Sequence, residues 1–107
     1  GKLPWLRIHL RGMRTLSKEN ELFFKYRAIT DGKATMIVKL VNSQTSDEYA
    51  VRLRNLNGKE WDDVIIPFAP KKRLPANQSR TVNEIHLLLE KPGELLIDDL
   101  LLYEPGK

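Results

Sequence analysis

The stretch that decides the fold of this chain is Leu22-Phe23-Phe24-Lys25-Tyr26-Arg27-Ala28. Its even positions are apolar or aromatic, whereas Lys25 and Arg27 lie at odd positions. Successive side chains of a β-strand point to opposite faces of the sheet, so this alternation indicates a strand with one face in a core and the other in water. The stretch therefore predicts a half-buried strand of the kind found in antiparallel sheets.

The same alternation recurs in the next two segments of the chain. In residues 35–41 the even positions Met, Val and Leu share a face, and Lys39 lies opposite them. In residues 49–54 the odd positions are apolar or aromatic, and Arg52 and Arg54 lie opposite. A period of two in three successive segments predicts antiparallel β-structure.

Turn signals and further apolar segments extend this pattern along the chain. Four more strands are expected, at residues 6–10, 63–68, 84–89 and 95–103. The turn signals are Asp31-Gly32, Asn57-Gly58 and Lys91-Pro92-Gly93. Residues 69–80, rich in lysine, arginine and proline, are expected to form a long exposed loop. Short strands separated by turns predict an all-β antiparallel sandwich.

One segment also allows a helix. Thr81-Val82-Asn83-Glu84 fits a capping box, with Ile85, Leu88 and Leu89 on one helical face. The alternation of Ile85, Leu87 and Leu89 in so short a segment favours a strand instead.

Composition limits the classes of protein. The chain has 107 residues, 41% of them hydrophobic and 30% charged, and no cysteine. This predicts one domain over residues 1–107, and it excludes disulfides and zinc–sulfur sites. No apolar run approaches the roughly 20 residues of a membrane helix, so no membrane partner is expected. No signal peptide is visible behind Gly1, so the chain is expected to be a module excised from a larger protein. The net charge of +4 favours anionic partners.

The last expected strand is an apolar run with two adjacent carboxylates, Glu94-Leu95-Leu96-Ile97-Asp98-Asp99-Leu100-Leu101-Leu102-Tyr103. Burying an unpaired carboxylate is strongly unfavourable. Asp98 and Asp99 are therefore expected to reach solvent, a cation or hydrogen-bond donors.

Five segments, taken in order, carry a family resemblance: residues 22–28, 36–40, 60–68, 82–85 and 96–99. A tryptophan, Trp61, opens a segment that ends in Ile66-Pro67-Phe68, and Ile97-Asp98-Asp99 lies in the closing strand. This order resembles the jelly-roll superfamily of carbohydrate-binding modules, the galactose-binding-like sandwiches appended to polysaccharide-degrading enzymes. The resemblance covers about residues 22–103. It implies a jelly-roll sandwich in a secreted or extracytoplasmic protein, which binds polysaccharide or oligosaccharide and holds an appended catalytic domain there.

The resemblance also implies that a structural calcium ion can be bound. Many members of the family bind calcium through a Phe-Glu pair near their start and an aspartate of the closing strand, and Asp98 matches that aspartate. Here Pro4-Trp5-Leu6-Arg7 stands near the position of the pair, and no acidic residue precedes Glu19. The alternative is that Asp98 or Asp99 caps a bulge or pairs with a neighbouring Lys or Arg.

A row of basic residues lies opposite the apolar faces of their strands: Lys25, Arg27, Lys39, Arg52 and Arg54. If these strands share one sheet, the row forms a cationic patch, and if they divide between two sheets, the patch is lost. The planar guanidinium suits carboxylate and sulfate groups, so the patch would favour an acidic glycan. The alternative is an ordinary solvated sheet face.

Sugar binding generally also needs an exposed aromatic ring. Trp5 and Phe23 are the best candidates for exposure, and Phe23 shares the face of Lys25 and Arg27. His86 lies on the expected outer face of its strand. These three residues join the basic row as candidate ligand-binding residues. Tyr26 and Tyr49 are expected in the core. Trp61 could cover a sandwich edge or line a cleft, but the family resemblance implies a structural residue and favours the core.

Catalysis is not expected. His9 and His86 each lie singly on a strand. The two Asp-Asp pairs, at 62–63 and 98–99, would point to opposite faces of their strands, so neither pair can flank one glycosidic bond.

Two other classes of binding function remain open. The sandwich could be a structural or protein-interaction module that packs against a catalytic neighbour. A flat polar outer face would favour that role, whereas a groove with exposed aromatics would favour sugar. Nucleic-acid binding is unlikely to be the role, because only Phe23 stands beside the basic row as a stacking platform.

Overall fold

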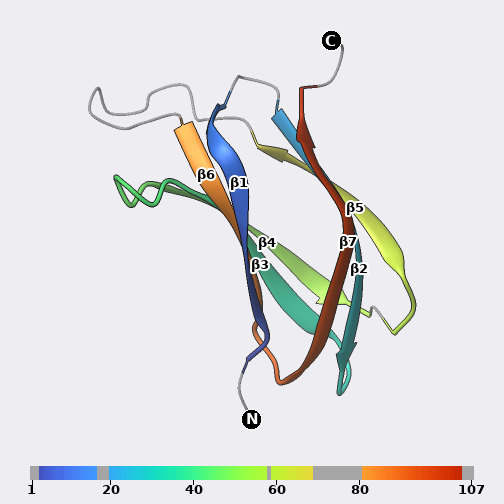
Figure 1. The fold of residues 1–107 in the computed structure, drawn as a ribbon. Coiled ribbons are helices and arrows are strands. Elements are labelled where there is room, and N and C mark those ends of the chain that lie inside the picture. Colours follow the sequence, from blue (N-terminus) through green and yellow to red (C-terminus); the bar gives the residue numbers. More distant parts are fainter. Residues whose placement is uncertain (1–2, 17–19, 58, 69–80, 105–107) are drawn as a thin grey trace.

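The computed structural model describes residues 3–16, 20–57, 59–68 and 81–104 of the chain (Figure 1). Seven strands occupy most of them. They are β1 Trp5–Thr15, β2 Asn20–Thr30, β3 Ala34–Val41, β4 Glu48–Leu56, β5 Asp62–Phe68, β6 Thr81–Leu89 and β7 Gly93–Tyr103. Each coincides with an expected strand, so the strand predictions are confirmed, including the choice of strand over helix at 81–89. None of the described residues forms a helix that is long and apolar enough to cross a membrane.

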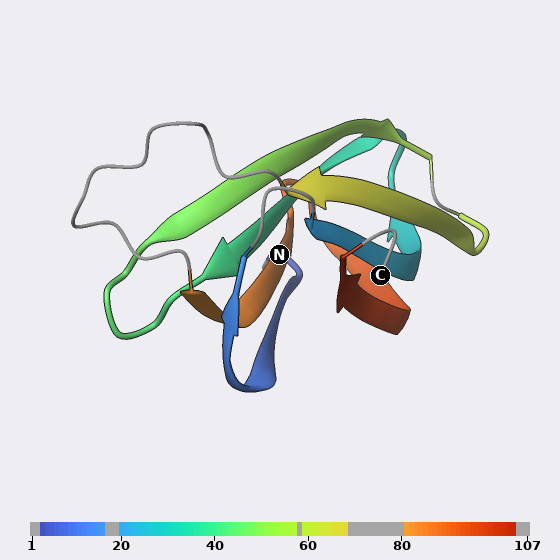
Figure 2. The ribbon, with the colours of Figure 1, turned by 90° about the horizontal axis from the view of Figure 1, so that it is seen from above.

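The strands form two antiparallel sheets, which confirms the predicted sandwich. One sheet has the order β1-β6-β3-β4, and the other has the order β5-β2-β7. Apart from β3 and β4, consecutive strands lie in different sheets, so the chain passes repeatedly from one layer to the other. Figure 2 shows the two layers from above, with β1 and β6 on the left and β2 and β7 on the right.

The core lies between the sheets and takes side chains from both. Wholly buried residues include Leu22, Phe24, Met36, Val38, Leu40, Ile85, Leu87 and Leu89. The rings of Phe24 and Tyr26 meet edge to face with centroids 6.2 Å apart. Tyr49 is half-buried against this core. The even positions of the opening stretch are thus inside as predicted, which places its odd positions on an outer face.

Two turns at one end of the sandwich are joined by a lysine. Asp31-Gly32 turns between β2 and β3 as predicted, and Gly32 has a φ of +81°. The Lys91 amine donates hydrogen bonds to the carbonyl oxygens of Asp31 and Lys33, at 2.7 and 3.0 Å. Lys91 belongs to the predicted turn before β7, so this contact links the two turns. Gly58 of the predicted Asn57-Gly58 turn and the predicted loop at 69–80 lie outside the described residues.

The closing strand β7 contains a bulge at Asp99 and Leu100, directly after Asp98. Phe23 of β2 pairs with Leu101, and Lys25 pairs with Asp98, so β7 has one residue more than β2 between these pairs. Asp99 takes a φ of +51°, and its N–H donates to the Asp98 carboxylate at 2.8 Å. Both side chains are exposed, and the Asp99 carboxylate lies 3.3 Å from the Lys25 amine. The expectation that these carboxylates reach solvent and a cation is confirmed.

Candidate functional site

The outer face of the four-stranded sheet brings distant segments into register. Trp5 lies opposite Leu88, which lies opposite Ile37, and Ile37 lies opposite Arg52. The next row across the same strands consists of Arg7, His86, Lys39 and Ala50. Side chains directly opposite one another on a sheet face are close enough to touch. The sheet therefore gathers an indole, an imidazole and several cations on one surface.

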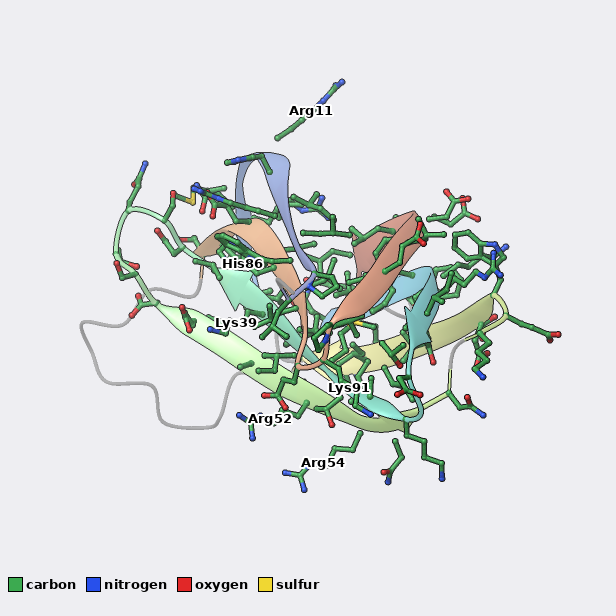
Figure 3. All side chains as sticks on the ribbon, turned by 90° about the horizontal axis from the view of Figure 1, so that it is seen from below. Arg11, Lys39, Arg52, Arg54, His86 and Lys91 are labelled. Carbon is green, nitrogen blue, oxygen red and sulfur yellow. The ribbon has the colours of Figure 1, made fainter. Side chains whose placement is uncertain are left out.

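A pocket of about 310 Å³ lies on this face, lined by Leu3, Trp5, Ile37, Lys39, His86 and Leu88. Trp5 is 56% exposed, and its ring meets that of His86 edge to face with centroids 5.7 Å apart. Lys39 supplies the pocket's amine, and Figure 3 shows it near His86 on the same side of the molecule as Arg52. The pocket thus combines an exposed aromatic ring, aliphatic walls and a cation.

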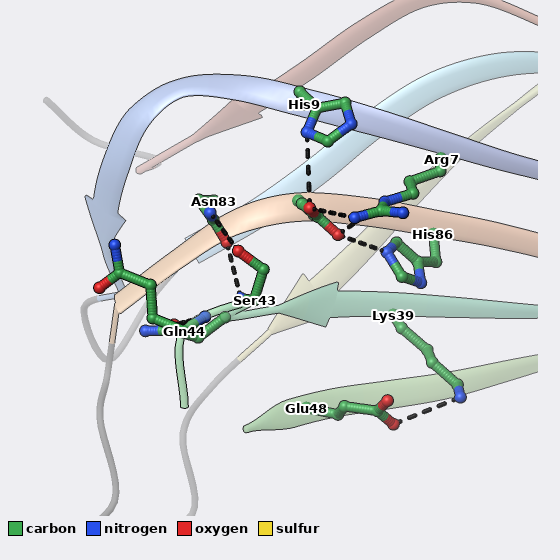
Figure 4. Close-up of polar contacts among 10 residues, drawn as sticks. Arg7, His9, Lys39, Ser43, Gln44, Glu48, Asn83 and His86 are labelled. Carbon is green, nitrogen blue, oxygen red and sulfur yellow. Dashed lines mark hydrogen bonds and ion pairs between the residues drawn. The ribbon is translucent and has the colours of Figure 1, made fainter. Parts of the chain in front are cut away.

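Glu84 holds the polar side chains around this pocket. Although it lies on the outer face, it is only 3% exposed, because Arg7, His9 and His86 cover it. Figure 4 shows these three side chains pointing toward one carboxylate, that of Glu84. Arg7 donates to both carboxylate oxygens at 3.0 and 2.9 Å, a geometry that also fixes the guanidinium. His9 Nδ1 lies 3.4 Å from Oε2.

These contacts hold Glu84 ionised. The hydrogen bond from Arg7, followed by that from His86, lowers the pKa of the Glu84 carboxyl to about 2. An ionised carboxylate only accepts hydrogen bonds, so His86 Nε2, 2.8 Å from Oε1, is the donor. Nδ1 of a neutral His86 is then an acceptor. The sequence reasoning missed Glu84. The sequence shows only that Glu84 and His86 lie on the same side of one strand, whereas the pairing of Glu84 with Arg7 depends on the contact of β1 with β6.

Two other cations of this face have exposed carboxylate partners. Lys39 lies 3.3 Å from Glu48, and Arg52 lies 3.4 Å from Glu90. Exposed ion pairs stabilise by about 0–1 kcal/mol. A ligand anion can therefore replace either carboxylate at little cost.

The predicted basic row divides between the two sheets. Lys39, Arg52 and Arg54 lie on the four-stranded sheet with Trp5 and His86, whereas Phe23, Lys25 and Arg27 lie on β2 of the other sheet. The strands of the basic row therefore divide between two sheets, which is the alternative under which the patch is lost. There is no single patch of all five cations in the described part of the chain. Alternation identifies the outward side of each strand, but it carries no information about which sheet the strand joins.

The outer face of the three-stranded sheet has a different character. Phe23 lies between Ile65 of β5 and Leu101 of β7, which are 54% and 56% exposed. We call these three residues the apolar row. Beside it, the Lys25 amine faces Asp99, and Arg27 Nε donates to the carbonyl oxygen of Lys59 at 2.8 Å. The cations of this face are thus engaged locally.

Trp61 is also exposed on this side of the molecule, which corrects the prediction that it lies in the core. The residue precedes β5, an edge strand that begins at Asp62, and its ring is 51% exposed. It lines a second pocket of about 240 Å³ together with Lys25, Asp62 and Asp63. The ring lies at the strand's beginning, where the core no longer covers it.

Calcium binding by Asp98 stays a prediction. Calcium takes six to eight oxygen ligands. One Asp98 oxygen accepts the Asp99 N–H. Among the described residues, no three His, Asp or Glu side chains come together in a group that could hold a metal ion. The alternative expectation, a bulge and a neighbouring Lys, is met: Asp98 accepts the N–H of Asp99 in the bulge, and Asp99 faces Lys25.

Comparison with known proteins gave no match. No protein-family model matches the chain. No curated protein and no solved structure matches it either.

Proposed function

We propose that this chain is a non-catalytic carbohydrate-binding module of the jelly-roll type, which binds polysaccharide through the outer face of its four-stranded sheet. The observation that carries the proposal is the pocket in which the exposed ring of Trp5 lies beside Lys39 and His86. Concave sites with apolar walls and a few polar groups are typical ligand sites.

The pocket has a complementary group for each part of a sugar acid. The Trp5 indole offers an apolar face to the C–H side of a pyranose, and Ile37 and Leu88 provide aliphatic walls. The Lys39 amine can donate a hydrogen bond to a carboxylate or sulfate, and Nδ1 of a neutral His86 can accept a hydrogen bond from a sugar hydroxyl. An acidic glycan is therefore the ligand that this pocket supports best.

The role follows from proximity. A module bound to a polysaccharide raises the effective concentration of an appended catalytic domain at that surface. The proposal thus includes a catalytic neighbour in the same secreted or extracytoplasmic protein.

A second candidate function has its own observation. The apolar row of Phe23, Ile65 and Leu101 crosses all three strands of the other sheet, and its outer members Ile65 and Leu101 are exposed while Phe23 is half-buried. Exposed apolar patches often mark interaction surfaces. A structural module that packs this face against a catalytic neighbour is therefore the alternative.

The test is affinity electrophoresis through gels containing neutral, uronate-rich or sulfated polysaccharides, each at low and high salt. We expect an acidic glycan to retard the protein at moderate salt. Trp5→Ala and Lys39→Ala should each weaken that retardation about tenfold or more, which corresponds to about 1.4 kcal/mol.

The matched control is Lys33→Ala, which removes the same charge from an exposed turn outside the pocket. It should bind as the original protein does. Equal retardation of Trp5→Ala and the control would contradict this site. The absence of retardation in all three gels would favour the structural module.

A further inference from the structure

We propose that the opposite side of the sandwich carries a second sugar site, centred on Trp61, which takes a neutral oligosaccharide. The site is the pocket of about 240 Å³ formed by Lys25, Trp61, Asp62 and Asp63. It belongs to the β5-β2 side of the three-stranded sheet, whereas the Trp5 pocket belongs to the four-stranded sheet. The inference is independent of the Trp5 pocket and adds a second binding surface to the proposed function.

The Trp61 ring is exposed on a backbone that is anchored on both sides. Ahead of it, Arg27 Nε donates to the Lys59 carbonyl oxygen at 2.8 Å. Behind it, Asp62 and Asp63 pair with Tyr26 and Lys25 at the beginning of β5. Anchoring of this kind reduces the conformational freedom that the backbone must lose on binding.

The polar groups of the pocket are placed by the same elements. The Asp62 carboxylate accepts the N–H of Asp63 at 2.9 Å, which fixes the first side chain of the strand. Lys25 reaches from the central strand, and its amine lies 3.3 Å from the Asp99 carboxylate. The exposed indole is thus flanked by side chains from two neighbouring strands and not by solvent alone.

The charges of the pocket select the ligand class. Two of the four lining residues are aspartates, Asp63 opposite Lys25 and Asp62 opposite Tyr26, and the Lys25 amine is paired with a third carboxylate, Asp99. An added uronate or sulfate would meet net negative charge here, so it is disfavoured. Carboxylates accept hydrogen bonds from hydroxyls, and the amine donates to ring or hydroxyl oxygens. With an indole to stack against, this set fits a neutral pyranose.

The two pockets therefore have opposite charge preferences. The Trp5 pocket offers Lys39, whereas the Trp61 pocket offers carboxylates. A module with both could bind two different chains of a mixed polysaccharide and gain from the high effective concentration of the second site after the first has bound.

The chain contains two tryptophans, one in each pocket, so single-tryptophan variants report the sites separately. Trp5→Phe leaves Trp61 as the reporter, and Trp61→Phe leaves Trp5. Each variant is titrated with cellohexaose, xylohexaose, mannohexaose and hexagalacturonate while the emission maximum is recorded. We expect a saturable shift of Trp61 emission with at least one neutral hexasaccharide and none with hexagalacturonate.

Asp63→Asn in the Trp5→Phe background should weaken the neutral titration about tenfold or more. Asp31→Asn in the same background changes an exposed turn carboxylate outside both pockets and should leave the titration unchanged. Circular dichroism of each variant confirms that the fold is retained.

The proposal is overturned if no neutral hexasaccharide shifts Trp61 emission at about 10 mM, a concentration that fills a site with a millimolar Kd. It is also overturned if hexagalacturonate produces the same shift, or if Asp63→Asn binds as its control does. Titration of Trp61→Phe with hexagalacturonate tests the Trp5 pocket by itself, so failure of one site is distinguishable from failure of the other.

Discussion

The outer faces of the two sheets carry similar residues in different arrangements. On the four-stranded sheet, Arg7 and two histidines surround the buried Glu84, while Lys39 and Arg52 keep exposed partners that a ligand can replace. On the three-stranded sheet, Lys25 faces Asp99 and Arg27 donates to a backbone carbonyl, beside an exposed apolar row. Both faces also present a tryptophan.

This difference shows that a count of basic residues does not define a cationic surface. What matters is which sheet each strand joins and whether the nearest carboxylate lies on the same face. The exposed lysines of the two faces are paired alike, Lys39 with Glu48 and Lys25 with Asp99. The faces differ in what lies beside these pairs: Arg7 and two histidines cover Glu84 on one face, and Asp62 and Asp63 lie beside Lys25 on the other. The two proposed sites therefore differ in the ligand charge that they favour.

The largest effect is expected from the core that both faces share. Phe24 is wholly buried between the sheets, so Phe24→Ala should lower the free energy of unfolding by about 3–5 kcal/mol. Urea unfolding is followed by the fluorescence of the single remaining tryptophan, Trp5 in Trp61→Phe and Trp61 in Trp5→Phe. The two transitions should coincide, and both should shift to lower urea by the same amount when Phe24→Ala is added. Separate transitions would mean that the two sheets unfold independently of each other.

A smaller effect, confined to the four-stranded sheet, is expected from Glu84→Gln. The pKa of the Glu84 carboxyl is about 2 in the folded protein, below its ordinary value of 4.5, so the fold favours the charged form. Its stabilisation is complete above pH 4.5 and is lost as the pH falls toward 2. The Tm of Glu84→Gln should therefore lie below that of the original protein at pH 6, and the difference should shrink between pH 4.5 and 2.

The control for this prediction is Glu48→Gln, because the Glu48 carboxylate is exposed beside Lys39. It should change the free energy of unfolding by no more than about 0.5 kcal/mol. A Tm difference for Glu84→Gln that stays constant down to pH 2 would show that the carboxylate does not act through its charge.

The smallest effects compare matched arginines on the two faces. Arg52→Ala should weaken retardation by an acidic glycan a few-fold, since Arg52 lies in the row of Trp5 and keeps only an exposed ion pair. Arg27→Ala should change it less than about twofold, because Arg27 lies on the other sheet and donates to Lys59. Affinity electrophoresis of both variants at one salt concentration checks this, and equal weakening would erase the distinction between the faces.

Local pattern was sufficient to predict the strands and their inward sides. Alternation in residues 22–28 placed Phe24 and Tyr26 inside and Lys25 outside, as the structure has them. The exposure of Trp5 was also expected. These features depend on the two-residue period of a strand, which is visible within a few residues.

The composition of each face could not be predicted, because it depends on strand order. Lys25 and Lys39 show the same local pattern but lie on different sheets. The contact of Arg7 with Glu84 joins residues that are 77 positions apart. Trp61 was expected to be buried on the basis of family resemblance, whereas its exposure follows from the position of β5 at a sheet edge.

The bulge in β7 has a consequence for how copies of this chain meet. A regular edge strand exposes a row of N–H and C=O groups to which another strand can pair. In the three-stranded sheet, β7 is an edge whose ladder is interrupted at Asp99 and Leu100, and the other edge, β5, carries Pro67, which has no N–H. Two charges in an apolar run therefore guard against edge-to-edge aggregation of a strand that would otherwise be among the most aggregation-prone in the sequence.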